Sequence, residues 1–128
     1  MRNFLKRYVK NEKGSQAIEF VAMFPLVILA FLIIWQVALI AFSLVVAESA
    51  ARDGARAAAI RDPDWKKVAE RSASGFNPVV HGGPGEKEAR VEVYIKAPVI
   101  ALPFIADMEF EFTADAVMPM EEDPDETD

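Results

Sequence analysis

The sequence predicts an α+β protein in which a long N-terminal transmembrane helix is followed by a short helix and a small antiparallel β-sheet module. Two observations predict this fold class. The run from Phe20 to Ala47 contains no charged residue, and a helix of this length, about 42 Å, exceeds the roughly 30 Å hydrocarbon core of a bilayer. Residues 90–96 and 108–116 alternate between apolar and polar side chains, which is typical of strands with one exposed face.

Charge is distributed unevenly along the chain, which has 128 residues and a net charge of −6 at pH 7. Residues 1–14 contain five basic residues and one acidic residue, whereas residues 48–128 contain nine basic and eighteen acidic residues. Basic residues beside a membrane span stay on the cytoplasmic side, so we expect a single-pass protein of the cytoplasmic membrane with its N-terminus inside and its module outside. The acidic outer part would repel phosphates, so nucleic acid is not an expected partner.

Three interpretations of the N-terminal segment are open. A secretory signal peptide has an apolar core of roughly 7–15 residues before a small-residue cut site; residues 45–47 would fit the cut site, but the apolar run is too long. An uncleaved anchor explains the span but gives no task to Glu19, the acid at its start. The third interpretation is a cleavable cytoplasmic leader, residues 1–14, cut between Gly14 and Ser15. A glycine suits such a site because its backbone can lie extended in a narrow cleft.

The residues around this site resemble a known family. The basic leader, Gly14, the small residue Ser15, and then Glu19 and Phe20 are similar to the processing site of type IV prepilins. The segment from residue 17 to 25 resembles the opening of TadE-like minor pseudopilins of the tight-adherence (Tad/Flp, type IVb) pilus systems. The small residues of segment 50–58 are also similar to that family. The resemblance covers residues 13–60 well and the C-terminal third loosely.

The resemblance implies a pilin-like fold and a role in assembling or priming a Tad/Flp pilus or secretion filament, and hence in cell adhesion or secretion. It also implies that a prepilin peptidase cuts after Gly14, and that other pilin or pseudopilin subunits, the Tad assembly platform and the lipid bilayer are partners. Cleavage would create an ammonium group on Ser15. Glu19, followed by Phe20, would then neutralise the ammonium of a neighbouring subunit, because a carboxylate near the bilayer is costly unless it is paired. Alternatively, Glu19 reaches the lipid headgroups.

Helical spacing continues beyond the span, so we expect one helix over residues 15–61 that contains the transmembrane segment 20–47. Small residues recur on one face of its outer part, and such residues let helices approach closely. The expected helix-packing residues are Ala47, Ala51, Gly54, Ala55 and Ala58. Two alternatives remain open for this face: it packs on the strands of its own chain, or it packs on other subunits.

The module is expected to cover residues 62–118. Asp62 would cap a short helix of about ten residues, with Pro63 at its first helical position and its end near Gly75. Residues 75–88 are rich in glycine and proline, which predicts a loop. His81, the only histidine, is expected to be a solvated side chain of this loop and no metal ligand.

Strand 90–96 is expected to turn Val91, Val93 and Ile95 to one face, and strand 108–116 shows the same alternation. Between the strands lies an apolar connection from residue 97 to 107. Its segment 99–105 either contacts a partner, or it tucks under the sheet or against the membrane surface. Residues 119–128 are predicted to form an acidic disordered tail, since six of the last eight residues are acidic.

No arrangement of side chains in the sequence indicates catalysis, because the chain has no cysteine, one histidine and no nucleophile beside a base. We therefore expect no enzymatic activity and no cofactor. The leading hypothesis is a minor pilin or pseudopilin. The alternative is an uncleaved single-span anchor whose outer module binds a partner or regulates an envelope complex. The N-terminal residue of the mature protein, Ser15 or Met1, distinguishes them.

Overall fold

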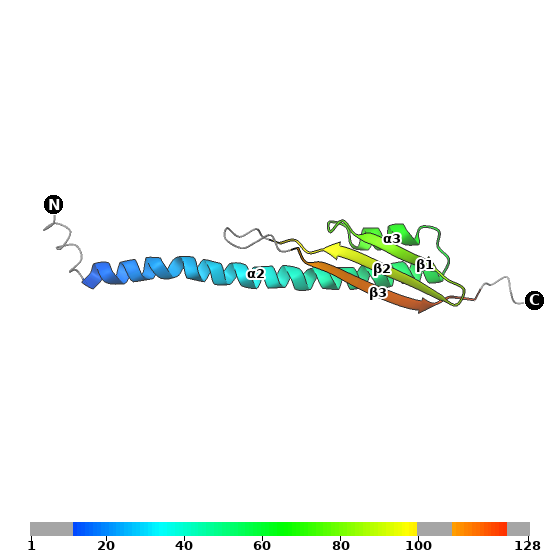
Figure 1. Cartoon of the computed structure of the whole chain (residues 1–128), viewed down its shortest axis with the longest axis horizontal. Coiled ribbons are helices and arrows are strands. Elements are labelled where there is room, and N and C mark those ends of the chain that lie inside the picture. Colours follow the sequence, from blue (N-terminus) through cyan, green and yellow to red (C-terminus); the bar gives the residue numbers. More distant parts are fainter. Residues whose placement is uncertain (1–11, 100–108, 123–128) are drawn as a thin grey trace, which may run out of the picture. The chain divides into compact units, whose positions relative to one another are not determined.

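The computed structural model describes residues 12–99 and 109–122. In chain order, its elements are helix α2 (Glu12–Ala59), helix α3 (Trp65–Ser72) and strands β1 (Val79–Pro84), β2 (Glu88–Lys96) and β3 (Glu111–Pro119) (Figure 1). The chain divides into two parts, Met1–Val37 and Ala38–Asp128. The second part contains the short helix and an antiparallel sheet, which confirms the predicted α+β class.

Helix α2 begins at Glu12 and ends at Ala59, so it includes residues 12–14 of the predicted leader and stops two residues before the predicted end at Arg61. Its C-terminus is closed by two backbone hydrogen bonds. The N–H of Arg61 donates to the carbonyl of Ala58, and the N–H of Asp62 donates to that of Ala57, both at 3.0 Å. Arg61 has a φ of 58°. This is a Schellman motif in which an arginine occupies the left-handed position usually taken by glycine.

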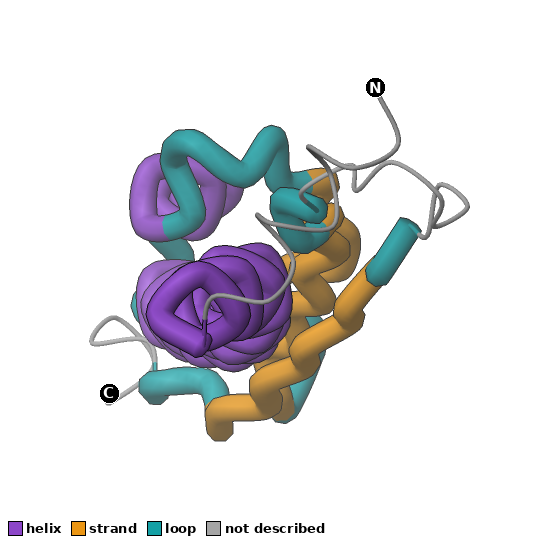
Figure 2. The backbone as a smooth tube through the Cα atoms, turned by 90° about the vertical axis from the view of Figure 1, so that its left-hand side faces the viewer, coloured by secondary structure: helices purple, strands orange, loops and turns teal. Residues whose placement is uncertain are grey.

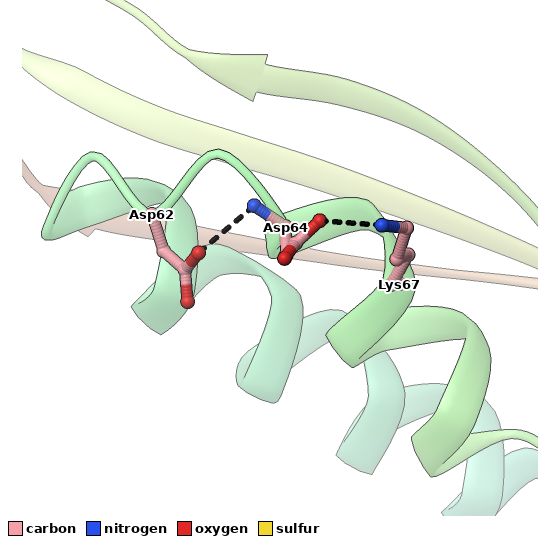
Figure 3. Close-up of polar contacts among 3 residues, drawn as sticks. All are labelled: Asp62, Asp64 and Lys67. Atoms are coloured by element: carbon pink, nitrogen blue, oxygen red, sulfur yellow. Dashed lines mark hydrogen bonds and ion pairs between the residues drawn. The ribbon is translucent and has the colours of Figure 1, made fainter.

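A turn at residues 60–64 separates α2 from α3 and differs from the predicted cap. The Asp62 carboxylate accepts a hydrogen bond from the backbone N–H of Asp64 at 2.8 Å, and Asp64, not Asp62, is the N-cap of α3 (Figure 3). The Asp64 carboxylate binds the Lys67 ammonium at 2.7 Å instead of capping the backbone. Pro63 therefore lies in the turn, ahead of the first helical residue, because Asp62 already forms a local turn with the residue after the proline.

The sheet has the strand order β1-β2-β3 with both pairs antiparallel. The alternation predicted for β2 is correct, since Val91, Val93 and Ile95 are buried and their neighbours face outward. The predicted loop over residues 75–88 is wrong for Val79–Pro84, which form β1 and pair with β2. Glycines weaken a strand when it stands alone, but here the β2 backbone holds the segment in register.

The core of the module lies between the sheet, α3 and the outer part of α2 (Figure 2). Gly54 is at the point of closest approach. A Cβ atom added there would lie 2.8 Å from the Cβ of Ala69 on α3 and 3.0 Å from Cγ1 of Val91 on β2. A glycine in a helix interior costs about 1 kcal/mol relative to alanine, and this double contact explains why one is present.

The C-terminal end of the described chain is tied to the module. Pro119 closes β3, the N–H of Met120 donates to the carbonyl of Lys87 at 2.9 Å, and the N–H of Glu121 donates to that of Ala59 at 3.1 Å. The predicted boundary of the tail at residue 119 is thus too early. Three predicted features lie partly outside the described residues: residues 1–11 of the leader, residues 100–107 of the apolar connection with residue 108 of the following strand, and residues 123–128 of the tail.

Candidate functional site

The predicted processing site lies within α2. Gly14 is half-buried and Ser15 is exposed, and both are helical, in the first turn after Glu12. A protease cleft requires an extended conformation of the Gly14–Ser15 bond, so cleavage needs this part of α2 to unwind.

The assembly residues predicted from the resemblance lie one turn further along α2. The side chain of Glu19 is exposed, and 73% of the surface of Phe20 is accessible. The next charged residue along the helix is Glu48. Glu19 is thus the one ionisable residue of α2 between Lys13 and Glu48.

That apolar surface is the most unusual feature of the N-terminal part. Among the residues that the structure describes, α2 is the one helix long and apolar enough to cross a membrane. Its large side chains are uncovered: exposed fractions are 67% for Leu26, 62% for Phe31 and 69% for Ile34. Helix α2 also continues through Pro25. A contiguous apolar surface of this size marks a membrane or protein contact, and its length favours a membrane-spanning helix.

The predicted helix-packing residues occupy the outer part of α2. Four of them are fully buried alanines, with exposed fractions of 0% at positions 47, 51, 55 and 58, and Gly54 is also buried. All of them belong to the part of the chain from Ala38 onward, and the alanines form one core cluster with Val91, Val93 and Ile95 of β2. Of the two alternatives left open by the sequence, the structure thus shows packing on the strands of the same chain.

The outward face of the sheet carries paired charges. Lys96 lies 3.2 Å from Glu111 and 3.6 Å from Glu109, and the hydrogen bond that its ammonium donates to Glu111, together with both negative charges, raises the pKa of Lys96. The Tyr94 hydroxyl donates to the Glu92 carboxylate at 3.0 Å, which raises the pKa of Tyr94. These groups are solvent-exposed partners of one another, as is typical of a solvated sheet face. Tyr94, Lys96 and Glu111 also line an open cavity of about 630 Å³ with Phe76 and Ala97.

His81 lies in β1, contrary to the predicted loop, and its ring meets the Tyr94 ring edge-on at a centroid distance of 5.4 Å. Within residues 12–99 and 109–122, no three His, Cys, Asp or Glu side chains gather in a way that would hold a metal ion. At the turn before α3, the Lys67 ammonium lowers the pKa of the Asp64 carboxyl through a hydrogen bond and its charge. Asp64 and Lys67 are thus bound to each other.

One cluster was not predicted from the sequence: the apolar residues at the end of the module where α2 enters it. Phe42 of α2 and Phe76 after α3 are in contact with their rings tilted by 51° at a centroid distance of 5.9 Å, and the pair was not predicted. Its signal in the sequence is weak, because the two residues are far apart along the chain and Phe42 falls inside the apolar run.

Comparison with known proteins shows similarity to one protein family. No curated protein and no solved structure matches the chain. Residues 14–56 match the family model described as TadE-like protein. The matched stretch begins at Gly14, contains Glu19 and Phe20, and extends over most of the buried small-residue face. The helical segment that carries the candidate site is therefore TadE-like, as the resemblance of its sequence predicted.

Proposed function

We propose that this chain is a minor pilin or pseudopilin that is processed after Gly14 and takes part in the assembly or priming of a Tad/Flp-type pilus or secretion filament. Its partners are then a prepilin peptidase, other pilin or pseudopilin subunits and the assembly platform of that system. Before assembly, the precursor would be anchored in the cytoplasmic membrane, with its basic leader inside and its α+β module outside.

The observation that carries this proposal is the isolation of Glu19. Its side chain is exposed at the start of an uncharged helical surface, inside the stretch that matches the TadE-like family model. A carboxylate near the hydrocarbon region is costly unless it has a partner. Cleavage between Gly14 and Ser15 supplies one, because it creates an ammonium group on each subunit.

The first test concerns cleavage. When the full chain is co-expressed with an active prepilin peptidase, we expect intact-mass and N-terminal measurements to give a product that begins at Ser15. Gly14→Val should abolish this product, because a branched side chain would not fit a cleft that accepts only an extended glycine backbone. Ser15→Ala is the matched control and should still be cut.

A catalytically inactive peptidase should leave the wild-type chain intact, which would show that cleavage is specific. If the wild-type chain retains Met1 in the presence of the active enzyme, the proposed processing is wrong. Cleavage after Val46 or Ala47 would instead identify a secretory signal.

The second test concerns Glu19. We expect Glu19→Ala to be inserted in the membrane as well as wild type, because the substitution makes the helix more apolar. It should nevertheless fail to enter filaments, since no carboxylate is left to pair with a neighbouring ammonium. Immunoblots of membrane and sheared-filament fractions measure both properties. Glu19→Asp, which keeps the charge, should restore at least part of the incorporation, and normal incorporation of Glu19→Ala would contradict the docking role.

An uncleaved single-span anchor is the second candidate function. One observation favours it: the small-residue face, from Ala47 to Ala58, is covered by the sheet and α3 of the same chain. That face is thus already buried without contact with another subunit. In this case the module would bind a partner outside the membrane, and the protein recovered from cells would begin at Met1.

A further inference from the structure

The sheet has one end near the point where α2 enters the module and one end far from it. At the near end, Leu44 of α2 lines a shared cleft with Thr113 and Ala114 of β3. At the far end, the backbone of Glu121 is bonded to Ala59, the last residue of α2. Strand β3 therefore runs in the same direction as α2. By the antiparallel register, β1 and β3 begin, and β2 ends, at the near end.

Apolar side chains gather at this near end. Phe42 and Val45 of α2 are 57% and 63% exposed, and Val99, three residues after β2, is 37% exposed. The Phe76 ring contacts that of Phe42 at a tilt of 51°, and Phe76 lines a cavity of about 630 Å³ together with Ala97, Lys96 and Glu111. Phe110 is joined to the same end because its carbonyl accepts a hydrogen bond from the N–H of Ala97 at 2.8 Å. We define the apolar rim by its five large side chains, Phe42, Val45, Phe76, Val99 and Phe110.

The near end also carries a cluster of paired charges beside Phe110. Lys96 forms ion pairs with Glu111 at 3.2 Å and with Glu109 at 3.6 Å. At the far end, the turn between β1 and β2 carries the exposed charged side chains of Glu86 and Lys87, and the apolar residues Ile60 and Val117 are 52% and 45% exposed. Phe42, Phe76 and Phe110 thus all lie at the near end, together with the exposed Val45 and Val99, and residues 38–45 of α2 lie at this same end.

The length of the charge-free run places this rim in a particular layer of the bilayer. From Phe20 to Val45 an α-helix rises roughly 38 Å at about 1.5 Å per residue. The hydrocarbon core is roughly 30 Å thick, and about 40–45 Å with both headgroup layers. If Glu19 lies at one surface, Phe42 and Val45 lie beyond the hydrocarbon core but within the opposite headgroup layer.

We propose that the apolar rim contacts the outer headgroup layer of the bilayer, so that the module stands directly on the membrane and is not held above it on a stalk. The occupant of the rim is lipid because Phe42 and Val45 belong to the charge-free run of residues 20–47, and the neighbouring charges of Lys96, Glu109 and Glu111 are paired with one another. Burial of these side chains contributes roughly 25 cal/mol per Å² of apolar surface removed from water. The contact orients the module before the subunit leaves the membrane.

This inference requires α2 to span the bilayer, but it does not require cleavage after Gly14. The two proposals therefore fail separately. A chain that is never processed would still place its rim on the membrane, and a processed chain would do so for as long as it remains in the bilayer.

Fluorescent labelling tests the rim in the full chain. Because the protein has no cysteine, Val99→Cys and Glu86→Cys each give one unique position for an environment-sensitive NBD label. Both chains are reconstituted in vesicles of phosphatidylcholine and phosphatidylglycerol, with or without a lipid that carries a nitroxide quencher on its headgroup. We expect the label at position 99 to emit at shorter wavelength and to be quenched several-fold more strongly than the label at position 86.

Two results would overturn the proposal. The first is a label at position 99 that emits as in water and is quenched no more than the label at position 86. The second is a shielded label whose quenching by lipid is absent and whose emission returns to that in water when the protein is diluted with excess lipid. This second result would show that another copy of the chain covers the rim.

Discussion

Gly82→Ala is expected to detach β1 from the sheet. Gly82 has a φ of 103° and faces the β2 backbone so closely that an added Cβ would overlap the carbonyl oxygen of Arg90. Neither the conformation nor the space accommodates a side chain, and a backbone carbonyl in a sheet cannot move aside cheaply. Strain and overpacking together should cost on the order of 3–5 kcal/mol, which is a large part of the stability of a small domain.

Hydrogen exchange of the full chain in detergent micelles measures this effect residue by residue. In Gly82→Ala, we expect the amides of residues 79–83 to lose protection, whereas the pairing of β2 with β3 persists. Gly75→Ala is the matched control. Gly75 also has a positive φ, 95°, but nothing lies within 4 Å of an added Cβ, so only the conformational cost of about 1–2 kcal/mol applies. Equal loss of protection in the two variants would contradict the proposed clash.

Gly54→Leu is expected to separate α2 from the rest of the module core. An added Cβ would already lie 2.8 Å from the Cβ of Ala69 and 3.0 Å from Cγ1 of Val91, and leucine adds three more carbon atoms. Leucine is the better helix former by roughly 1 kcal/mol, yet overpacking a core without free space costs about 1–3 kcal/mol and occasionally more. The steric cost exceeds the gain in helix propensity, because no side-chain rotation can move the Cβ atom of Ala69 away from the leucine.

The same exchange measurement should show loss of protection in β2 and α3 while α2 remains helical. Ser49→Leu is the control on the same helix, since Ser49 is exposed, and it should leave the exchange pattern of the module core unchanged. Gly54→Ala should lie between the two, with a net loss of roughly 0–2 kcal/mol after the gain in helix propensity. A Gly54→Leu chain as protected as wild type would show that the contact with Ala69 and Val91 is not needed for stability.

Several features could be predicted from the sequence because they depend on patterns that neighbouring residues display. The absence of charge from Phe20 to Ala47 predicts a membrane-spanning helix, whatever it later packs against. The alternation around Val91 and Val93 predicts a strand with one buried face. The basic leader, Gly14, the segment from residue 17 to 25 and the small residues of segment 50–58 together suggested the TadE-like resemblance that the family model supports over residues 14–56.

The tertiary structure alone decided three other features. Val79–Pro84 form a strand although two glycines and a proline favour a loop, because the backbone of β2 supplies its hydrogen-bonding partner. The small residues from Ala47 to Ala58 pack on their own chain, and composition cannot distinguish that from packing on another subunit. The apolar rim brings Phe42 together with Phe76, a contact that exists only after the chain folds back. Local pattern thus determines which segments become helix or strand, whereas the partner of each surface depends on residues distant in sequence.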